Sequence, residues 1–99
     1  MTLDLVFPVL GTSVATDHAY ELYGALSRVV AGFHAEESPL RFAPITGQAV
    51  PGGQLRIAEY SVLRVRLADL DVALALPLAG KKLMVGESNV RLGVPSVTR

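Results

Sequence analysis

The sequence contains no cysteine, so a disulfide framework, a thiolate nucleophile and a cysteine-ligated zinc site are excluded. It also lacks an excess of either charge. Nine basic residues balance nine acidic ones, so whole-chain charge does not point to a nucleic acid or an anionic membrane as partner. Long apolar runs are missing too. Stretches such as 72–79 fall far short of the roughly 20 residues that a spanning helix needs, and we expect a soluble protein.

The chain is short and rich in apolar residues. With 99 residues, 51% of them apolar, it suits one compact domain, residues 1–99, and is too short for two. Residues 3–10 are similar to the core of a signal peptide, but no Lys or Arg precedes them and Asp4 interrupts them. We therefore expect a cytoplasmic location.

The first half of the chain predicts a strand, a helix and a second strand. Alternating apolar residues over 3–10 are typical of a strand with one buried face. An apolar stripe at helical spacing predicts an amphipathic helix from Ala19 to about His34. Residues 40–46 predict a second strand, at an edge or with a bulge, because Pro44 cannot donate a hydrogen bond to a neighbouring strand.

The second half predicts two more strands, a helix and a closing hairpin. Alternation predicts a short strand at 55–57 and a clear one at 63–67, both with arginines on one face. A short apolar helix follows over 69–80, made irregular by Pro77. Residues 82–94 are typical of a hairpin or a bent strand.

The order of these elements predicts a fold class. Strand, helix, strand, strand, helix, strand is the βαββαβ pattern of α+β domains of the ferredoxin-like (RRM-like) kind. In these domains two helices cover one face of a four-stranded antiparallel sheet. This fold hosts many unrelated functions, so it does not by itself indicate a chemistry.

Two histidines are the candidates for acid–base chemistry, because imidazole titrates near neutrality. His18 lies in the first turn of the predicted helix and His34 at its far end. His34 is well placed to donate a proton, since the dipole at that end favours the imidazolium. Either residue could instead be structural, His18 as a solvated N-terminal residue and His34 as a cap.

Charge is divided unevenly along the chain. Residues 1–39 carry a net charge of −4 and residues 40–99 a net charge of +4. Strands displaying Arg56, Arg64 and Arg66 could follow a phosphate backbone, or they could form an ordinary solvated face or pack on another domain. Ordinary RRM-type recognition is not expected, because the clear strand exposes arginines where that motif uses stacking aromatics.

Two tyrosines and two glycine-containing turns complete the candidates. Tyr20 lies off the apolar stripe of the first helix and is free to meet a substrate, whereas Tyr23 belongs to the stripe. The turns at residues 11–13 and 80–82, the latter carrying Lys81 and Lys82, lack the spacing of a nucleotide-binding loop. His18 has only one potential metal ligand near it, so neither a metal nor a cofactor is expected.

Several segments together resemble a known family. They are residues 5–11, 17–20, 22–28, 61–67, 76–83 and 91–95. In this order they look like the N-terminal half of the CRISPR repeat-RNA endoribonucleases, which belong to the RAMP superfamily, in their MYXAN-type branch. The resemblance implies tandem ferredoxin-like domains, metal-independent cleavage of precursor CRISPR RNA within its repeats, and retention of the guide RNA in an antiviral effector complex.

The resemblance also implies a mechanism. The ribose 2′-OH attacks the adjacent phosphate and leaves a 2′,3′-cyclic phosphate. A histidine in or just after the first helix, His34 by preference or else His18, acts as acid or base. Tyr20 positions the 2′-OH, and basic side chains such as Arg56, Arg64, Arg66, Lys81 and Lys82 bind the RNA.

The chain departs from the family pattern in one respect. The family continues into a second domain with a glycine-rich RNA-binding loop, whereas this sequence ends at Arg99. A C-terminal domain or a second copy of the chain is expected to supply that half, with effector-complex subunits as further partners. Two other functions stay open: a non-catalytic module that binds guide RNA or helps assembly, and a ferredoxin-like module that dimerises through its sheet.

Overall fold

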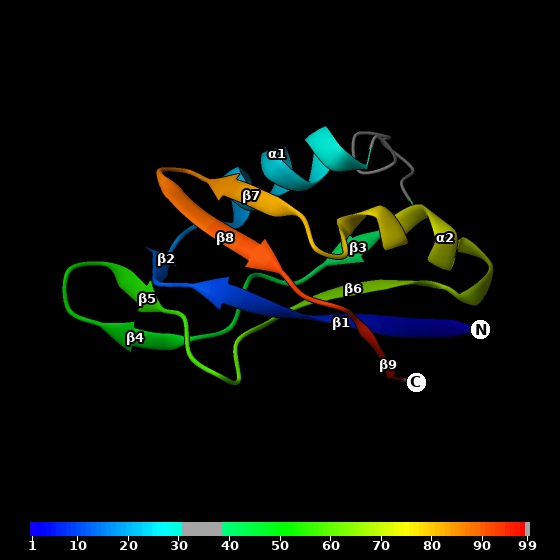
Figure 1. Cartoon of the computed structure of the whole chain (residues 1–99), viewed down its shortest axis with the longest axis horizontal. Coiled ribbons are helices and arrows are strands. Elements are labelled where there is room, and N and C mark those ends of the chain that lie inside the picture. The colour runs from blue at the N-terminus through cyan, green and yellow to red at the C-terminus, as the bar shows by residue number, and fades with distance from the viewer. Residues whose placement is uncertain (31–38, 99) are drawn as a thin grey trace.

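The computed structural model describes residues 1–30 and 39–98, which form antiparallel sheets and two α-helices (Figure 1). The main sheet comprises β1 (Thr2–Gly11), β3 (Arg41–Phe42), β6 (Val62–Ala68), β7 (Lys82–Val85), β8 (Ser88–Leu92) and β9 (Ser96–Thr98). Its strand order is β3-β6-β1-β8-β7, and β9 also pairs with β1. A smaller sheet has the order β2-β5-β4, with β2 at Ser13–Ala15, β5 at Gln54–Arg56 and β4 at Gln48–Val50.

The pair β1–β6 forms the centre of the molecule. The two strands run antiparallel from the pair Thr2 and Ala68 to the pair Pro8 and Val62. Their alternating apolar residues all turn to one face and are buried: Leu3, Leu5, Phe7 and Val9 on β1, and Leu63, Val65 and Leu67 on β6. The alternation predicted both strands because burial of one face requires a period of two residues.

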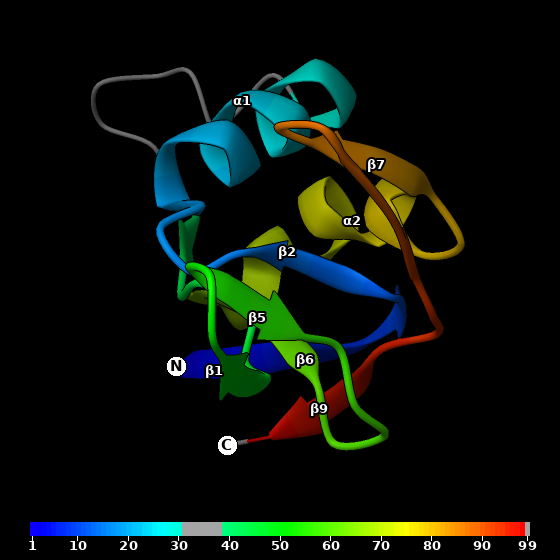
Figure 2. The same ribbon diagram turned by 90° about the vertical axis from the view of Figure 1, so that its left-hand side faces the viewer.

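The helix α1 (Ala19–Val29) covers this core and packs against β7 (Figure 2). Leu22, Ala25 and Leu26 on its inner side are buried. The prediction that the helix continues to about His34 was wrong, because α1 ends at Val29 and Val30 has extended backbone angles. Residue 34 lies outside the described part of the chain.

The second helical segment is short and irregular, as predicted. It consists of a 3-10 turn η2 (Asp69–Asp71), the helix α2 (Val72–Ala75) and a second 3-10 turn η3 (Leu76–Leu78) that contains Pro77. Gly80 follows with a φ of 76°, a left-handed conformation that glycine adopts without strain. None of the described helices is long and apolar enough to cross a membrane.

The prediction of a simple four-stranded sheet was wrong, although the α+β class is confirmed. The main sheet is curled and six-stranded, because residues 82–98 contribute the hairpin β7–β8 and also β9. The predicted strand at 40–46 shrinks to Arg41–Phe42 ahead of Pro44. The short strand at 55–57 leaves the main sheet and pairs with β2 and β4 as β5.

A β-bulge allows β8 and β9 to share one edge of β1. Val9 pairs with Leu92 and Val6 with Ser96, so two residues of β1 face three on the other strand. In this bulge the N–H of Gly93 donates to the carbonyl of Pro8 at 2.8 Å. A Cβ atom at Gly93 would lie 3.3 Å from the Cβ of Pro8, so any other residue would crowd the proline ring.

Candidate functional site

His18 is buried at the start of α1, with only 2% of its surface exposed. Its Nδ1 lies 2.8 Å from the carbonyl oxygen of Ala15, and the backbone N–H of Ile45 donates to its Nε2 at 2.9 Å. Because Nε2 accepts a hydrogen bond, the ring proton belongs on Nδ1, which donates it to Ala15. The ring therefore joins the start of α1 to the segment that follows β3.

This geometry gives His18 a structural role and argues against His18 as the catalytic residue. A general acid or base must reach the substrate through a ring nitrogen or one intervening water. Both ring nitrogens of His18 instead bind backbone groups in the interior. The other candidate, His34, lies outside the described residues.

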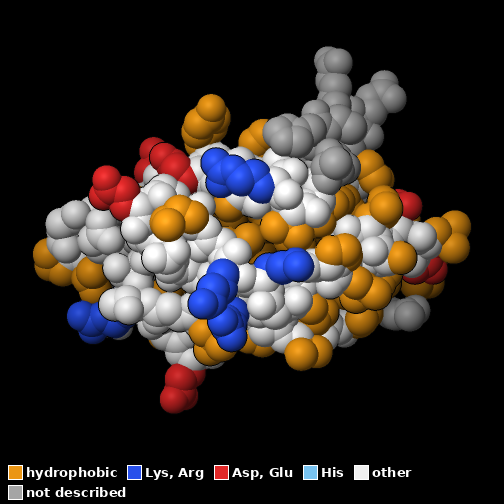
Figure 3. Space-filling model, turned by 45° about the horizontal axis from the view of Figure 1, so that its top comes forward, with side chains coloured by type: hydrophobic (Ala, Val, Ile, Leu, Met, Phe, Trp, Pro, Cys, Tyr) orange, Lys and Arg blue, Asp and Glu red, His pale blue; other side chains and the backbone are white. Residues whose placement is uncertain are grey.

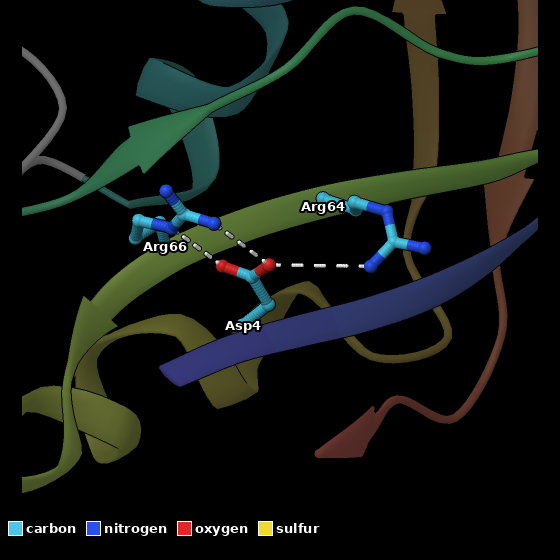
Figure 4. A network of polar contacts seen from close by, with 3 residues as sticks. All are labelled: Asp4, Arg64 and Arg66. Atoms are coloured by element: carbon cyan, nitrogen blue, oxygen red, sulfur yellow. Dashed lines mark hydrogen bonds and ion pairs between the residues drawn. The ribbon is translucent and has the colours of Figure 1, made fainter. Parts of the chain in front are cut away.

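An ion-pair network occupies the face of the main sheet opposite the core (Figure 4). Asp4 on β1 lies across from Arg66 on β6. The Nε of Arg66 donates to Oδ1 of Asp4 at 2.9 Å and its Nη2 to Oδ2 at 3.3 Å. Arg64 contributes a longer ion pair, with its Nη1 at 3.9 Å from Oδ2. One carboxylate therefore orients two guanidinium groups.

The same network shifts the acidity of Asp4. The hydrogen bond from Arg66 lowers the pKa of Asp4 below its ordinary value of 3.8, and the positive charges of Arg66 and Arg64 act in the same direction. Desolvation opposes this shift without cancelling it. Asp4 is therefore ionised at neutral pH and compensates part of the positive charge on this face.

A third arginine extends this basic surface. Arg41 on β3 pairs in register with Arg66, and its Nη1 donates to the carbonyl of Leu40 at 3.0 Å. Asp4, Arg41, Arg64 and Arg66 line a shallow hollow of about 230 Å³ together with Phe42 and Ala43. Three guanidinium groups and a single carboxylate make this hollow net positive, a suitable surface for an anion.

The prediction that Arg56 shares a face with Arg64 and Arg66 was wrong. Arg56 belongs to β5 in the smaller sheet, opposite Ser13 of β2, whereas Arg64 and Arg66 belong to β6. Arg56 lines a separate hollow of about 480 Å³ beside the turn at residues 11–13. The strands that carry these arginines lie in different sheets, because β5 pairs with β2 rather than with β6.

The two lysines lie elsewhere again. Lys81 is exposed in the turn before β7, and Lys82 is the first residue of β7. Lys82 pairs in register with Arg91 on β8, and both side chains are exposed. The structure therefore divides the predicted RNA-binding residues among three surfaces: the β6 face, the β5 hollow and the β7–β8 hairpin.

The two tyrosines of α1 differ as expected. Tyr23 is half-buried against the core and stacks on Phe42, with 6.5 Å between ring centroids and 19° between ring planes. Tyr20 is 81% exposed and lines a groove between α1 and β7. Within the described residues, no group of three or more His, Asp or Glu side chains could hold a metal ion.

Sequence reasoning did not assign Asp4, Arg41 or Arg91 to any of these surfaces. From the sequence, Asp4 was treated as an interruption of an apolar run. Once the strand register is known, an acidic residue opposite an arginine predicts a cross-strand ion pair. Arg41 and Arg91 were visible as charges, but their partners, Arg66 and Lys82, follow only from the strand pairing.

Comparisons with known proteins identify the family. A family model described as "Cas6 Crispr" matches residues 3–99. The "CRISPR-associated endonuclease Cas6" of Myxococcus xanthus (strain DK1622) is 35% identical over 95 residues, which cover 96% of this chain and 40% of that protein. A solved structure, "CRISPR associated protein Cas6", superposes with a TM-score of 0.68 at 12% identity, covering all of this chain and 48% of that one. The chain thus spans less than half the length of either relative. With its family model matched from residue 3 to residue 99, this chain belongs to the Cas6 family of CRISPR-associated proteins.

Proposed function

We propose that this chain is part of an endoribonuclease that cleaves precursor CRISPR RNA within its repeats and then retains the guide RNA. The observation that carries the proposal is the family match over almost the whole chain, together with 35% identity to a protein named as a CRISPR-associated endonuclease. The basic surfaces around Arg64 and Lys82 support an RNA ligand, because phosphate contacts dominate the affinity of such complexes.

The proposed reaction needs no metal. The 2′-oxygen of a ribose forms a bond to the adjacent phosphorus while the bond from phosphorus to the 5′-oxygen breaks. A base takes the 2′-OH proton and an acid protonates the leaving 5′-oxygen, so the products are a 2′,3′-cyclic phosphate and a 5′-OH. We assign the acid or base to His34, since the ring nitrogens of His18 already bind backbone groups.

Tyr20 and the basic side chains complete the proposed machinery. The exposed phenol of Tyr20 is free of partners among the described residues and is assigned to the 2′-OH of the ribose. A basic side chain offsets the charge that builds on the phosphorane, and preorganised charges of this kind give large rate effects in other enzymes. Arg64, Arg66 and Lys82 are assigned to binding of the RNA backbone.

The partners belong to the same proposal. Because the chain spans less than half of its relatives, we propose that a further domain or a second copy of the chain completes the RNA-binding surface. Subunits of a CRISPR effector complex would then meet the retained guide RNA.

A cleavage assay tests the catalytic assignment. Labelled CRISPR repeat RNA is incubated with excess protein in EDTA, and single-turnover rates are compared for wild type, His34→Ala and His18→Ala. General acid–base catalysis contributes roughly 10²- to 10⁴-fold, so His34→Ala should slow cleavage by at least a hundredfold. The fraction of folded protein is measured for each variant, and rates are expressed per folded molecule. A His18→Ala rate that falls as far as that of His34→Ala would overturn the assignment.

A second candidate is a non-catalytic module that binds or scaffolds guide RNA. It is favoured by the arginines on the outer face of β6, whose charge suits phosphates, and by the ring nitrogens of His18, which bind backbone groups rather than facing a substrate. Salt-sensitive binding of repeat RNA without cleavage would select this module. A dimer whose formation ignores both RNA and salt would instead select an assembly module.

A further inference from the structure

A groove runs along α1 where the helix meets β7. Its volume of about 360 Å³ falls within the range of roughly 300–1,000 Å³ that is usual for small-ligand clefts. Tyr20, Gly24 and Arg28 line one side at intervals of four residues, so they form a single row along the helix of about 12 Å. Met84 of β7 and Gly86 of the following turn line the opposite side.

Gly24 lies in the middle of the row on α1 that lines the groove, and the fold does not require a glycine there. Glycine is unfavourable in the interior of a helix. A Cβ atom added at Gly24 would meet nothing within 4 Å, so no neighbouring group excludes a side chain. Because Gly24 has no side chain, the space between Tyr20 and Arg28 is open.

The side chains that line the groove are of two kinds, apolar and charged. Tyr20 and Met84 are 81% and 50% exposed and offer an aromatic ring and a thioether, both of which pack well on planar rings. Glu21 and Arg28 supply opposite charges, and neither side chain has a hydrogen-bond or ion-pair partner among the described residues. A nucleobase combines the matching features: two apolar faces and an edge of donors and acceptors.

Positive charge continues from the groove along the β7–β8 hairpin. Lys82 and Met84 share the exposed face of β7, about 6.6 Å apart along the strand, and Arg91 lies opposite Lys82 on β8. Figure 3 shows this side of the molecule, with several Lys and Arg side chains near its middle, another at its left end, and acidic side chains at the upper left, the right and the lower edge. A chain of phosphates would thus meet cations directly beside the groove.

We propose that this groove binds one unpaired nucleobase of single-stranded RNA, stacked between Tyr20 and Met84, while Lys82 and Arg91 contact the neighbouring phosphates. The inference rests on the proposed function, because it takes RNA as the ligand and adds which part of the RNA this surface holds. Stacking uses the ring of Tyr20 and leaves its hydroxyl for the ribose.

Two short oligonucleotides isolate the contribution of the base. One is an unstructured RNA of about eight nucleotides that contains all four bases, and the other is an abasic strand of the same length and charge. Fluorescence anisotropy gives the affinity of each. Stacking of one base on an aromatic side chain corresponds to roughly 5- to 150-fold in affinity, so wild type should prefer the RNA by that factor.

Filling the groove should remove this preference without unfolding the protein. Gly24→Leu places a side chain in the groove and improves the helix propensity of α1. Ala19→Leu adds the same side chain to an exposed position of α1 that does not line the groove, and is the matched control. We expect Gly24→Leu to bind both strands equally and Ala19→Leu to keep the preference. Tyr20→Phe should keep it and Tyr20→Ala should lose it.

The outcomes separate this inference from the proposed function. A base preference that Gly24→Leu abolishes would support the groove even if repeat RNA is never cleaved. Equal binding of the two strands by wild type would overturn the inference, and so would a preference that Gly24→Leu leaves intact, even if the chain cleaves repeat RNA.

Discussion

At the residue scale, the two histidines show what a linear pattern can and cannot predict. Their presence in or near the first helix identified them as candidates, but the decisive contact of His18 is with Ile45, 27 residues further along the chain. No local spacing encodes such a contact. The same holds for Asp4, whose partner Arg66 is 62 residues away and becomes its neighbour only through the β1–β6 register.

The role of His18 predicts a loss of stability. In His18→Ala the buried N–H of Ile45 loses its acceptor, and an unsatisfied buried donor costs roughly 1–3 kcal/mol. The free energy of unfolding, measured by urea denaturation, should fall by at least that amount, since the ring also leaves a cavity. Thr16→Ala, at an exposed position nearby, should change it by less than about 0.5 kcal/mol. Equal stability of the two variants would contradict the buried role.

The Asp4 network predicts a dependence of stability on pH. A carboxyl group whose pKa is lowered in the folded state stabilises the protein above its unfolded pKa. That stabilisation is lost as the pH falls through the lower folded pKa. Asp4→Asn should therefore unfold at lower urea concentration than wild type at pH 7, by a small margin because the arginines are exposed. The difference should shrink as the pH falls through the acid range and Asp4 becomes protonated, and one that stays constant with pH would count against the ion pairs.

At the element scale, periodicity predicted the elements that bury a full face. The strands β1 and β6 and the helix α1 each present a buried apolar stripe, which requires a period of two or about four residues. Short elements carry too few residues for such a signal. β9, for example, has three exposed residues and owes its place to a backbone bulge rather than to burial.

Two glycines give opposite predictions at this scale. Gly24→Ala should raise the free energy of unfolding by up to about 1 kcal/mol, because alanine favours the helix and its Cβ meets no neighbour. Gly93→Val should lower it by roughly 1–3 kcal/mol, because its side chain would press on the rigid ring of Pro8. Thermal or urea denaturation measures both changes, and a shift of the same sign for both variants would contradict the bulge geometry.

At the scale of the whole molecule, zero net charge concealed separate basic surfaces. The charge asymmetry between the two halves of the sequence was visible, but the fold decided how it is distributed. Arg64 and Arg66 share their face with Asp4, whereas Lys82 and Arg91 lie on the β7–β8 hairpin. The family was predictable from ordered segments spread over the chain, and the family match confirms that prediction.

Exposed apolar side chains predict self-association at high concentration. Leu70 is 93% exposed in the segment before α2, and Leu74 and Leu76 follow it with about half of their surface exposed. Sedimentation velocity should show association that increases with protein concentration, and Leu70→Glu should weaken it. A monomer at every concentration would contradict this expectation. The outer face of β6 is a poorer candidate for this contact, because it carries charged rather than apolar side chains.

The measurement that tests the account most directly is single-turnover cleavage of a CRISPR repeat RNA in EDTA, run beside the same repeat carrying 2′-O-methyl groups throughout. The proposed function predicts a product with a 2′,3′-cyclic phosphate from the unmodified RNA, no product from the methylated RNA, and loss of cleavage in His34→Ala. Cleavage of the methylated RNA would contradict attack by the 2′-OH. No cleavage of the unmodified repeat by folded protein would contradict the catalytic proposal for this chain and select the non-catalytic module instead.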